Sequence, residues 1–113
     1  MIGQRIELNV ATEFSRTPGP RLRREGDDSG EEFLEKLLRP RFLMALEAKT
    51  RLFVNLDGAA GYPSSFLEEA FGGLAREFTS SKVEENIEIS CTDEPYLVDQ
   101  TLKYIRQAKQ KKK

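Results

Sequence analysis

The chain has 113 residues, of which 33% are charged and 38% hydrophobic, and its formal net charge is −1. We expect a single soluble domain over residues 1–113 with a core of modest size. The balanced charge excludes the strong field that steers basic proteins to nucleic acid or anionic membranes. No apolar run approaches the roughly 20 residues of a transmembrane helix, and residues 1–10 lack the layout of a signal peptide.

The chain has no histidine and one cysteine, Cys91. Ser-His and Cys-His nucleophile pairs, histidine-containing zinc sites and thiolate clusters are therefore excluded. A single cysteine forms no internal disulfide, which is typical of the reducing cytoplasm, and Cys91 fits a small buried side chain. We expect a cytoplasmic protein that is not an enzyme and uses no metal or other cofactor.

The first predicted strand contains Ile6, Leu8 and Val10, which alternate with polar residues. The proline- and glycine-rich segment FSRTPGPRLRREGDDSG follows, and its X-Pro pairs disfavour helix. We consider two interpretations of this arginine arm: a solvated loop, or an anion- or partner-binding arm, because arginine suits phosphate geometry. The arginines in question are Arg16, Arg21, Arg23 and Arg24.

A helix is predicted to begin at Gly30, because Ser29 stands three residues before Glu32 at the spacing of a capping box. Its apolar face continues to Leu46, and Pro40 predicts a kink or a break within it.

The central stretch is LFVNLDGAAGYPSSFLEEAFGGLAREF, which begins at Leu52 and ends at Phe78. It predicts a short strand, a turn-rich loop and a helix with apolar residues at intervals of three and four. Ser65 stands three residues before Glu68, so we predict that these two form the helix cap. Ser64 is then left without a capping role, beside the positive end of the helix dipole where a phosphate is favoured. A plain helix start with two small polar residues is the alternative.

The remaining elements are a polar connection at 79–85, a third strand from Ile87 to about Cys91, and a final helix. The helix is predicted from an apolar stripe between Leu97 and Ala108 and from start signals in Thr92-Asp93-Glu94-Pro95. The basic tail at 109–113 fits a frayed helix end.

Strands that alternate with helices predict parallel pairing through right-handed crossovers. We therefore expect an α/β fold with a mostly parallel or mixed sheet of three to five strands, and part of the arginine arm could add a strand. About three helices would lie mainly on one face. The loop DGAAGYPSS and residues 91–93 both follow strands, so we expect them to lie close together. Gly72-Gly73 predicts either a close backbone approach or a weak point in the helix.

The segment VNLDGAAGYPSSFLEEAFGGL resembles the central motif of STAS domains, the anti-sigma-factor antagonist class. In that alignment Ser64 falls on the position of the family's phosphorylatable serine, although Pro63 replaces its Asp and Phe66 its Gly. Together with FSRTPGPR and SGEEF, the string SSFLEEAFGGL more specifically resembles the bacterial STAS-like domain of unknown function. The resemblance covers about 14–78 and implies a helix layer mainly on one face of the sheet.

Two classes of function remain open. The resemblance implies a non-enzymatic signalling module that binds a histidine-kinase-like ATPase or an anti-sigma-type regulator, with Ser64 as the phosphoacceptor candidate. The alternative is a small-anion or nucleotide-binding domain that uses the arginine arm and a helix N-terminus. Asp57 and Tyr62, in the loop before Ser64, are further candidates for contacts with an anion or a partner.

Overall fold

A computed structural model describes residues 5–108 and shows an α/β fold built on a parallel sheet. The strands are β1 (Ile6–Asn9), β2 (Leu52–Asn55) and β3 (Ile87–Ser90), in the spatial order β1-β2-β3. The three predicted strands and their parallel pairing are confirmed, but Val10, which was expected in the first strand, is the first residue of helix α1 (Val10–Glu13). The arginine arm contributes no strand to this sheet among residues 5–108, so the fourth strand considered for it is wrong.

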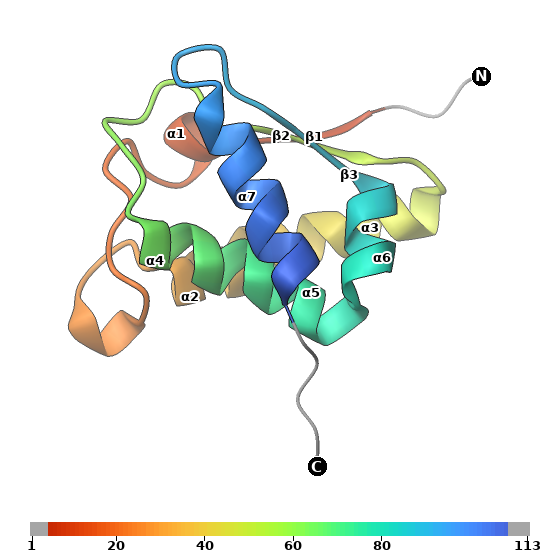
Figure 1. The fold of residues 1–113 in the computed structure, drawn as a ribbon, viewed down its shortest axis with the longest axis horizontal. Helices are drawn as coiled ribbons and strands as arrows, with labels where there is room; N and C mark the ends of the chain where they lie inside the picture. Colours follow the sequence, from red (N-terminus) through yellow and green to blue (C-terminus); the bar gives the residue numbers. More distant parts are fainter. Residues whose placement is uncertain (1–4, 109–113) are drawn as a thin grey trace.

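One face of the sheet is buried and the other is open. Leu8, Val54 and Ile89 lie side by side in the pairing register, and all three are buried against the helices. Residues on the opposite face, such as Glu7 and Glu88, are exposed. Figure 1 shows the long helices packed along one side of the three strands. The predicted helix layer on one face is therefore confirmed.

Two long helical stretches, 30–48 and 64–78, form the centre of the helix layer, and each contains a π-helical segment. The first comprises α2 (Gly30–Phe33), η2 (Leu34–Leu38) and α3 (Arg39–Ala48); the second comprises α4 (Ser64–Leu67), η3 (Glu68–Gly72) and α5 (Gly73–Phe78). The helix start at Gly30 is confirmed, since the Ser29 hydroxyl accepts the N–H of Glu32 at 3.0 Å.

Pro40 does not break its helix. The π-helical segment ends just before it, and the N–H of Arg39 reaches back to the carbonyl of Leu34. A π-helical turn changes the hydrogen-bond ladder at the position where proline lacks an N–H and crowds the preceding turn. The helix therefore continues through Pro40 to Ala48.

The shorter elements are α1 (Val10–Glu13), the 3-10 turn η1 (Arg23–Glu25), α6 (Ser80–Asn86) and α7 (Tyr96–Gln107). Two expectations change here. The segment predicted as a polar connection is helix α6, which Thr79 caps by accepting the N–H of Lys82 at 3.2 Å. The final helix begins at Tyr96 with Pro95 at its N-cap, because Thr92 and Asp93 are bonded to another loop. The basic tail at 109–113 lies outside the described residues.

The two long helices approach each other closely at their glycines. A Cβ on Gly30 would lie 2.7 Å from the carbonyl oxygen of Phe66, and one on Gly73 would lie 2.9 Å from Leu34 Cδ2. The close approach considered for Gly72-Gly73 is therefore confirmed at Gly73. Phe66, the neighbour of Gly30, stacks its ring on Phe33 at 5.6 Å between centroids, and the ring centroid of Phe14 lies 6.2 Å away.

Candidate functional site

Two loops meet at the carboxyl edge of the sheet, as the parallel topology predicts. Asp57, just after β2, accepts three hydrogen bonds from the segment that follows β3. Thr92 donates to Asp57 Oδ2 through its backbone N–H at 3.1 Å and its hydroxyl at 2.8 Å. The N–H of Asp93 donates to Asp57 Oδ1 at 2.8 Å. The predicted proximity of the two loops is confirmed.

The Asp57 carboxylate is held in its charged form. Hydrogen bonds from the backbone N–H groups of Asp93 and Thr92, followed by the Thr92 hydroxyl, lower the pKa of Asp57 to about 2. Donors that bond only to the ionised carboxylate stabilise that form. In return, Gly58 donates its N–H to Asp93 at 3.2 Å. Asp57 therefore links the loops after β2 and β3 and fixes the shape of this edge.

We expect Asp57→Asn to lower the melting temperature at pH 7, because asparagine keeps the shape but loses the charge that attracts three donors. A depressed pKa stabilises the folded state above the unfolded value of 3.8, and that contribution disappears as the pH falls towards 2. The difference between wild type and variant should therefore narrow between pH 5 and pH 2 in thermal melts. Asp27→Asn is the matched control, and an equal pH dependence in both variants would contradict the role of Asp57.

Tyr62 lies in the same loop and anchors it to the sheet. Its hydroxyl donates to the carbonyl of Leu56 at 2.9 Å, and its ring lies 6.0 Å from that of Phe66. Burial raises the pKa of Tyr62, with smaller effects from Cys91 and Asp57. Tyr62 therefore orders the loop from within, although it was predicted as a contact for a ligand. Cys91 is buried, and that burial raises the pKa of its thiol.

The predicted cap at Ser65 and Glu68 is wrong. The helix starts one residue earlier, at Ser64, and Pro63 is its N-cap without a side-chain hydrogen bond. The carbonyl of Pro63 accepts the N–H of Phe66 at 3.0 Å and that of Leu67 at 3.3 Å. Pro63 has φ −59° and ψ 140°, the non-helical conformation that is usual for an N-cap residue. Ser64 is exposed and occupies the first position of the helix.

Glu68 has a different role, as the centre of an ion-pair cluster on the first turns of the helix. Its carboxylate bonds to Arg76 at 2.7 Å and to Arg21 of the arm, and Arg21 also reaches Glu69 at 3.3 Å. Burial alone would raise the pKa of Glu68, but the hydrogen bonds from Arg76 and Arg21 outweigh it and lower the pKa. The cluster therefore attaches the arginine arm to the helix that begins at Ser64.

The four arginines of the arm do not share one site. Arg21 bonds to Glu68 and Glu69, whereas Arg23 bonds to Glu35 on the other long helix. Arg16 lies beside the loop after β2, where its backbone carbonyl accepts the N–H of Ala60 at 2.7 Å. Arg24 is exposed on η1. The arm is thus largely a structural connection, and Arg16 is its member at the carboxyl edge.

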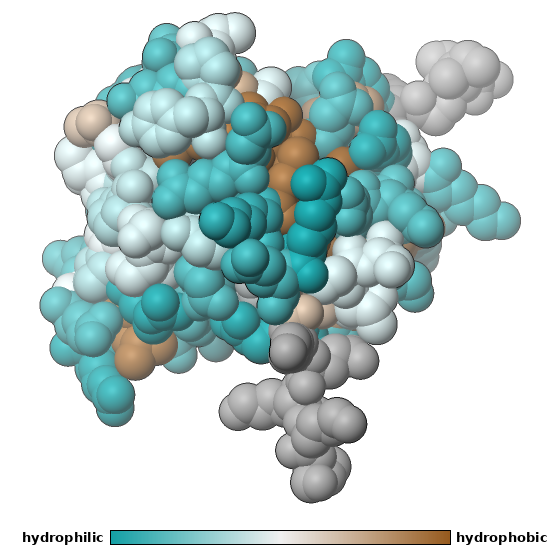
Figure 2. Space-filling view, in the orientation of Figure 1, coloured by the Kyte–Doolittle hydropathy of each residue, from teal (hydrophilic) through white to brown (hydrophobic). Residues whose placement is uncertain are grey.

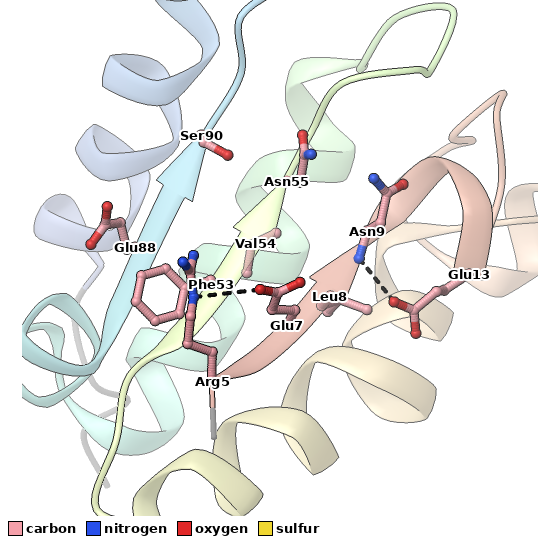
Figure 3. Close-up of a pocket in the computed structure, with 10 residues that line it drawn as sticks. All are labelled: Arg5, Glu7, Leu8, Asn9, Glu13, Phe53, Val54, Asn55, Glu88 and Ser90. Atoms are coloured by element: carbon pink, nitrogen blue, oxygen red, sulfur yellow. Dashed lines mark hydrogen bonds and ion pairs between the residues drawn. The ribbon is translucent and has the colours of Figure 1, made fainter. Parts of the chain in front are cut away.

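The open face of the sheet carries a second, shallow site that the sequence interpretation missed. Figure 3 shows that its lining residues come from all three strands, with Phe53 near one end and Asn9, Asn55 and Ser90 near the other. The hollow measures about 330 Å³. The guanidinium of Arg5 lies 3.9 Å above the Phe53 ring and 3.4 Å from Glu7. The strand LFVN carries the large apolar residue Phe53 between Leu52 and Val54, which hid the fact that Phe53 and Asn55 face away from the helices.

The described part of the chain offers no ready metal site and no membrane span. Within residues 5–108, no group of three or more Asp, Glu, Cys or His side chains is arranged to hold a metal ion. Over the same residues, none of the helices has both the length and the apolarity that crossing a membrane requires.

The fold and the site define a small α/β module of the STAS-like type: a parallel sheet, a helix layer on one face, and an exposed serine where the second long helix begins after β2. A family model described as a STAS-like domain of unknown function matches residues 29–97. The chain belongs to this family. The matched range extends through β3 to the start of α7 and leaves out FSRTPGPR. Searches of curated proteins and of solved structures found no match. Membership of the family suggests a regulatory or interaction module.

Proposed function

We propose that this protein is a non-enzymatic signalling module that acts in the cytoplasm and binds a protein partner under the control of phosphorylation at Ser64. Family membership and the position of Ser64 support the proposal. Ser64 is exposed at the first position of a helix that follows a strand of the sheet, beside the ordered loop of Asp57 and Tyr62. By resemblance to STAS domains, the partner is a histidine-kinase-like ATPase or an anti-sigma-type regulator.

The surroundings of Ser64 suit a phosphate. The first N–H groups of a helix have no acceptor within it, and the helix dipole favours negative charge there. Residues four apart lie on the same side of a helix, so Ser64 is a neighbour of Glu68 and of the Arg21 bonded to it. A phosphate at Ser64 would compete with Glu68 for Arg21, so the arm would respond to modification without unfolding of the domain.

The alternative of a small-anion or nucleotide site has weaker support. Arg21 and Arg23, two of the four arginines assigned to it, are engaged with carboxylates on different helices. Two carboxylates, Asp57 and Asp93, lie at the carboxyl edge beside the loop where the anion would bind. Their charge opposes the binding of a free anion, whereas a phosphate joined covalently to Ser64 is held in place.

The proposal is tested with three forms of the full chain: unmodified, phosphorylated at Ser64, and phosphorylated at Ser81. Ser81 is the matched control, because it is exposed in the first turn of α6. We expect the circular dichroism to be the same for all three forms. A host protein captured by affinity purification should bind the unmodified and Ser64-phosphorylated forms with free energies that differ by about 1–3 kcal/mol in calorimetry.

Phosphorylation at Ser81 should leave this binding unchanged. If phosphate at Ser64 leaves partner affinity unchanged, or if Ser81 has the same effect, Ser64 is an ordinary surface serine at a helix start and the switch is refuted.

A further inference from the structure

The two edges of the sheet differ in whether their backbone groups are free. On β1, the carbonyl of Glu7 and the N–H of Asn9 point away from the sheet. Arg41 donates to that carbonyl at 2.6 Å, and Glu13 accepts that N–H at 3.0 Å. Arg41 and Glu13 also form an ion pair with each other. Side chains thus bond to one carbonyl and one N–H at the edge of β1, and such cover is a known protection against unwanted strand pairing.

In the described part of the chain, the outer edge of β3 keeps backbone groups without a hydrogen-bond partner at one residue, Ile89, although Ile87 and Ile89 are only 1% and 7% exposed. Leu56 donates its N–H to the carbonyl of Ser90 at 2.9 Å, so the backbone of Ser90 faces β2. Because direction alternates along a strand, the backbone groups of Ile87 and Ile89 face outwards. Arg51 donates to the carbonyl of Ile87 at 2.8 Å. Among residues 5–108 no side chain or strand bonds to the outward N–H and C=O of Ile89.

A groove runs along this free edge. It measures about 330 Å³, and its apolar lining consists of Ile87, Ile89 and Leu102. Figure 2 shows hydrophobic residues at the bottom of a hollow between α7 and the β3–α6 segment. The charged residues of the groove are already matched, since Arg51 pairs with Glu88 and Arg106 with Glu84.

Helix α7 determines what shape of ligand fits. In a right-handed β-α order, the helix after β3 lies on the helix side of the sheet, over the position that a fourth strand would occupy. Leu102 of α7 lines the groove at that position. A helix, α7, is therefore already present on the helix side of this edge, whereas the position of a fourth strand beside β3 is empty in the described range, 5–108. A second copy pairing through its own β3 would bring a second α7 into the same layer, which favours an isolated extended segment over a dimer.

We propose that the edge of β3 binds an extended segment of a partner protein, which adds to the sheet as its fourth strand. The N–H and C=O of Ile89 supply the backbone hydrogen bonds of such an addition. Alternate side chains of the segment are apolar and pack against Leu102 and Ile89, while the intervening ones face the open side of the sheet. Because the charges of the groove are paired, the segment is uncharged at its centre. This surface is distinct from Ser64 and is independent of the phosphorylation proposal.

The test uses a displayed library of twelve-residue random peptides, selected on the immobilised full chain. We expect enriched peptides with apolar residues at alternate positions. Leu102→Lys should weaken the best synthetic peptide by about tenfold or more, because it places a charge in the groove. Leu43→Lys is the matched control: Leu43 is 45% exposed on α3 and lines neither groove, so affinity should change less than about twofold.

A second measurement leaves the protein intact. N-methylation of the peptide removes backbone donors, and in a strand only alternate N–H groups face the sheet. Methylating the apolar positions should abolish antiparallel pairing, whereas methylating the intervening positions should abolish parallel pairing. Only one of the two sets of N-methylated positions should therefore weaken binding of the peptide to the protein. Equal effects of both sets, or no effect of either, would refute strand addition.

Two other results would also overturn the proposal. The first is the absence of peptides that prefer the wild-type chain to Leu102→Lys. The second is a dimer in sedimentation that Leu102→Lys dissociates, because the occupant of the edge would then be a second copy. The selection needs neither phosphate nor a native partner, so failure of the Ser64 switch would leave its outcome unaffected.

Discussion

Replacing Phe66 by alanine is expected to reduce the free energy of unfolding by about 3–5 kcal/mol, the usual loss for a buried phenylalanine. Phe66 is fully buried, and its ring contacts three others from separate parts of the chain. The centroid distances are 6.2 Å to Phe14 of the arm, 5.6 Å to Phe33 of the first long helix and 6.0 Å to Tyr62 of the candidate site. The alanine cavity would loosen all three contacts at once.

Urea unfolding of the wild type, Phe66→Ala and Phe66→Leu measures this effect. Phe66→Leu keeps most of the volume and should lose clearly less than the alanine variant. Tyr96→Ala is the surface control, since Tyr96 is 61% exposed at the start of α7. A loss from Phe66→Ala no larger than that from Tyr96→Ala would mean that the aromatic cluster does not hold the arm and the loop to the core.

The strands were predictable because a strand with one buried face alternates apolar and polar residues along the sequence. Ile6 and Leu8 alternate with polar residues, as do Ile87 and Ile89, and each pair lies on the helix face of the sheet. Chain order then implied parallel pairing, and parallel pairing implied that Asp57 would lie near the segment after β3. This step from sequence to site succeeded because it depends on topology alone.

The cap predicted at Ser65 was wrong because contacts with residues distant in the sequence, which the spacing of Ser65 and Glu68 does not reveal, engage Glu68. A capping box needs Glu68 to reach back to the start of the helix, but Arg21 and Arg76 bind its carboxylate instead. Arg21 is 47 residues away in the sequence, and only the folded arm brings it to the helix. The helix also starts one residue earlier than predicted, because Pro63 is the N-cap and its carbonyl accepts the N–H groups of Phe66 and Leu67.

Helix α6 was missed for a related reason. Val83 is its only buried residue, so the segment has no apolar stripe to reveal a helix. The cap at Thr79 and the packing of α6 on its neighbours, including α7, decide the structure instead. The sequence likewise did not predict the free edge of β3, because that edge exists only where no further strand pairs with β3 in the folded sheet.

The contact between the two long helices gives the last prediction. The Ser29 cap predicts a helix that begins at Gly30, but it gives no sign that Gly30 itself is constrained. In the structure, a Cβ on Gly30 would lie 2.7 Å from the carbonyl oxygen of Phe66 and 3.2 Å from both Phe66 Cα and Glu69 Cβ. Two of these neighbours are backbone atoms, so no side-chain rotation relieves the overlap.

We expect Gly30→Val to lower the free energy of unfolding by about 3 kcal/mol, the upper part of the range for overpacking, because the two helices must separate to admit the side chain. Valine is also a poor helix former, so propensity offsets little of this loss. Gly61→Val is the control: a Cβ there meets no atom within 4 Å, and the change should stay within about 0.5 kcal/mol. Urea unfolding of both variants decides the matter. Equal stabilities would show that the helices are not in backbone contact at Gly30. A large loss would show that this contact sets the position of the helix that carries Ser64.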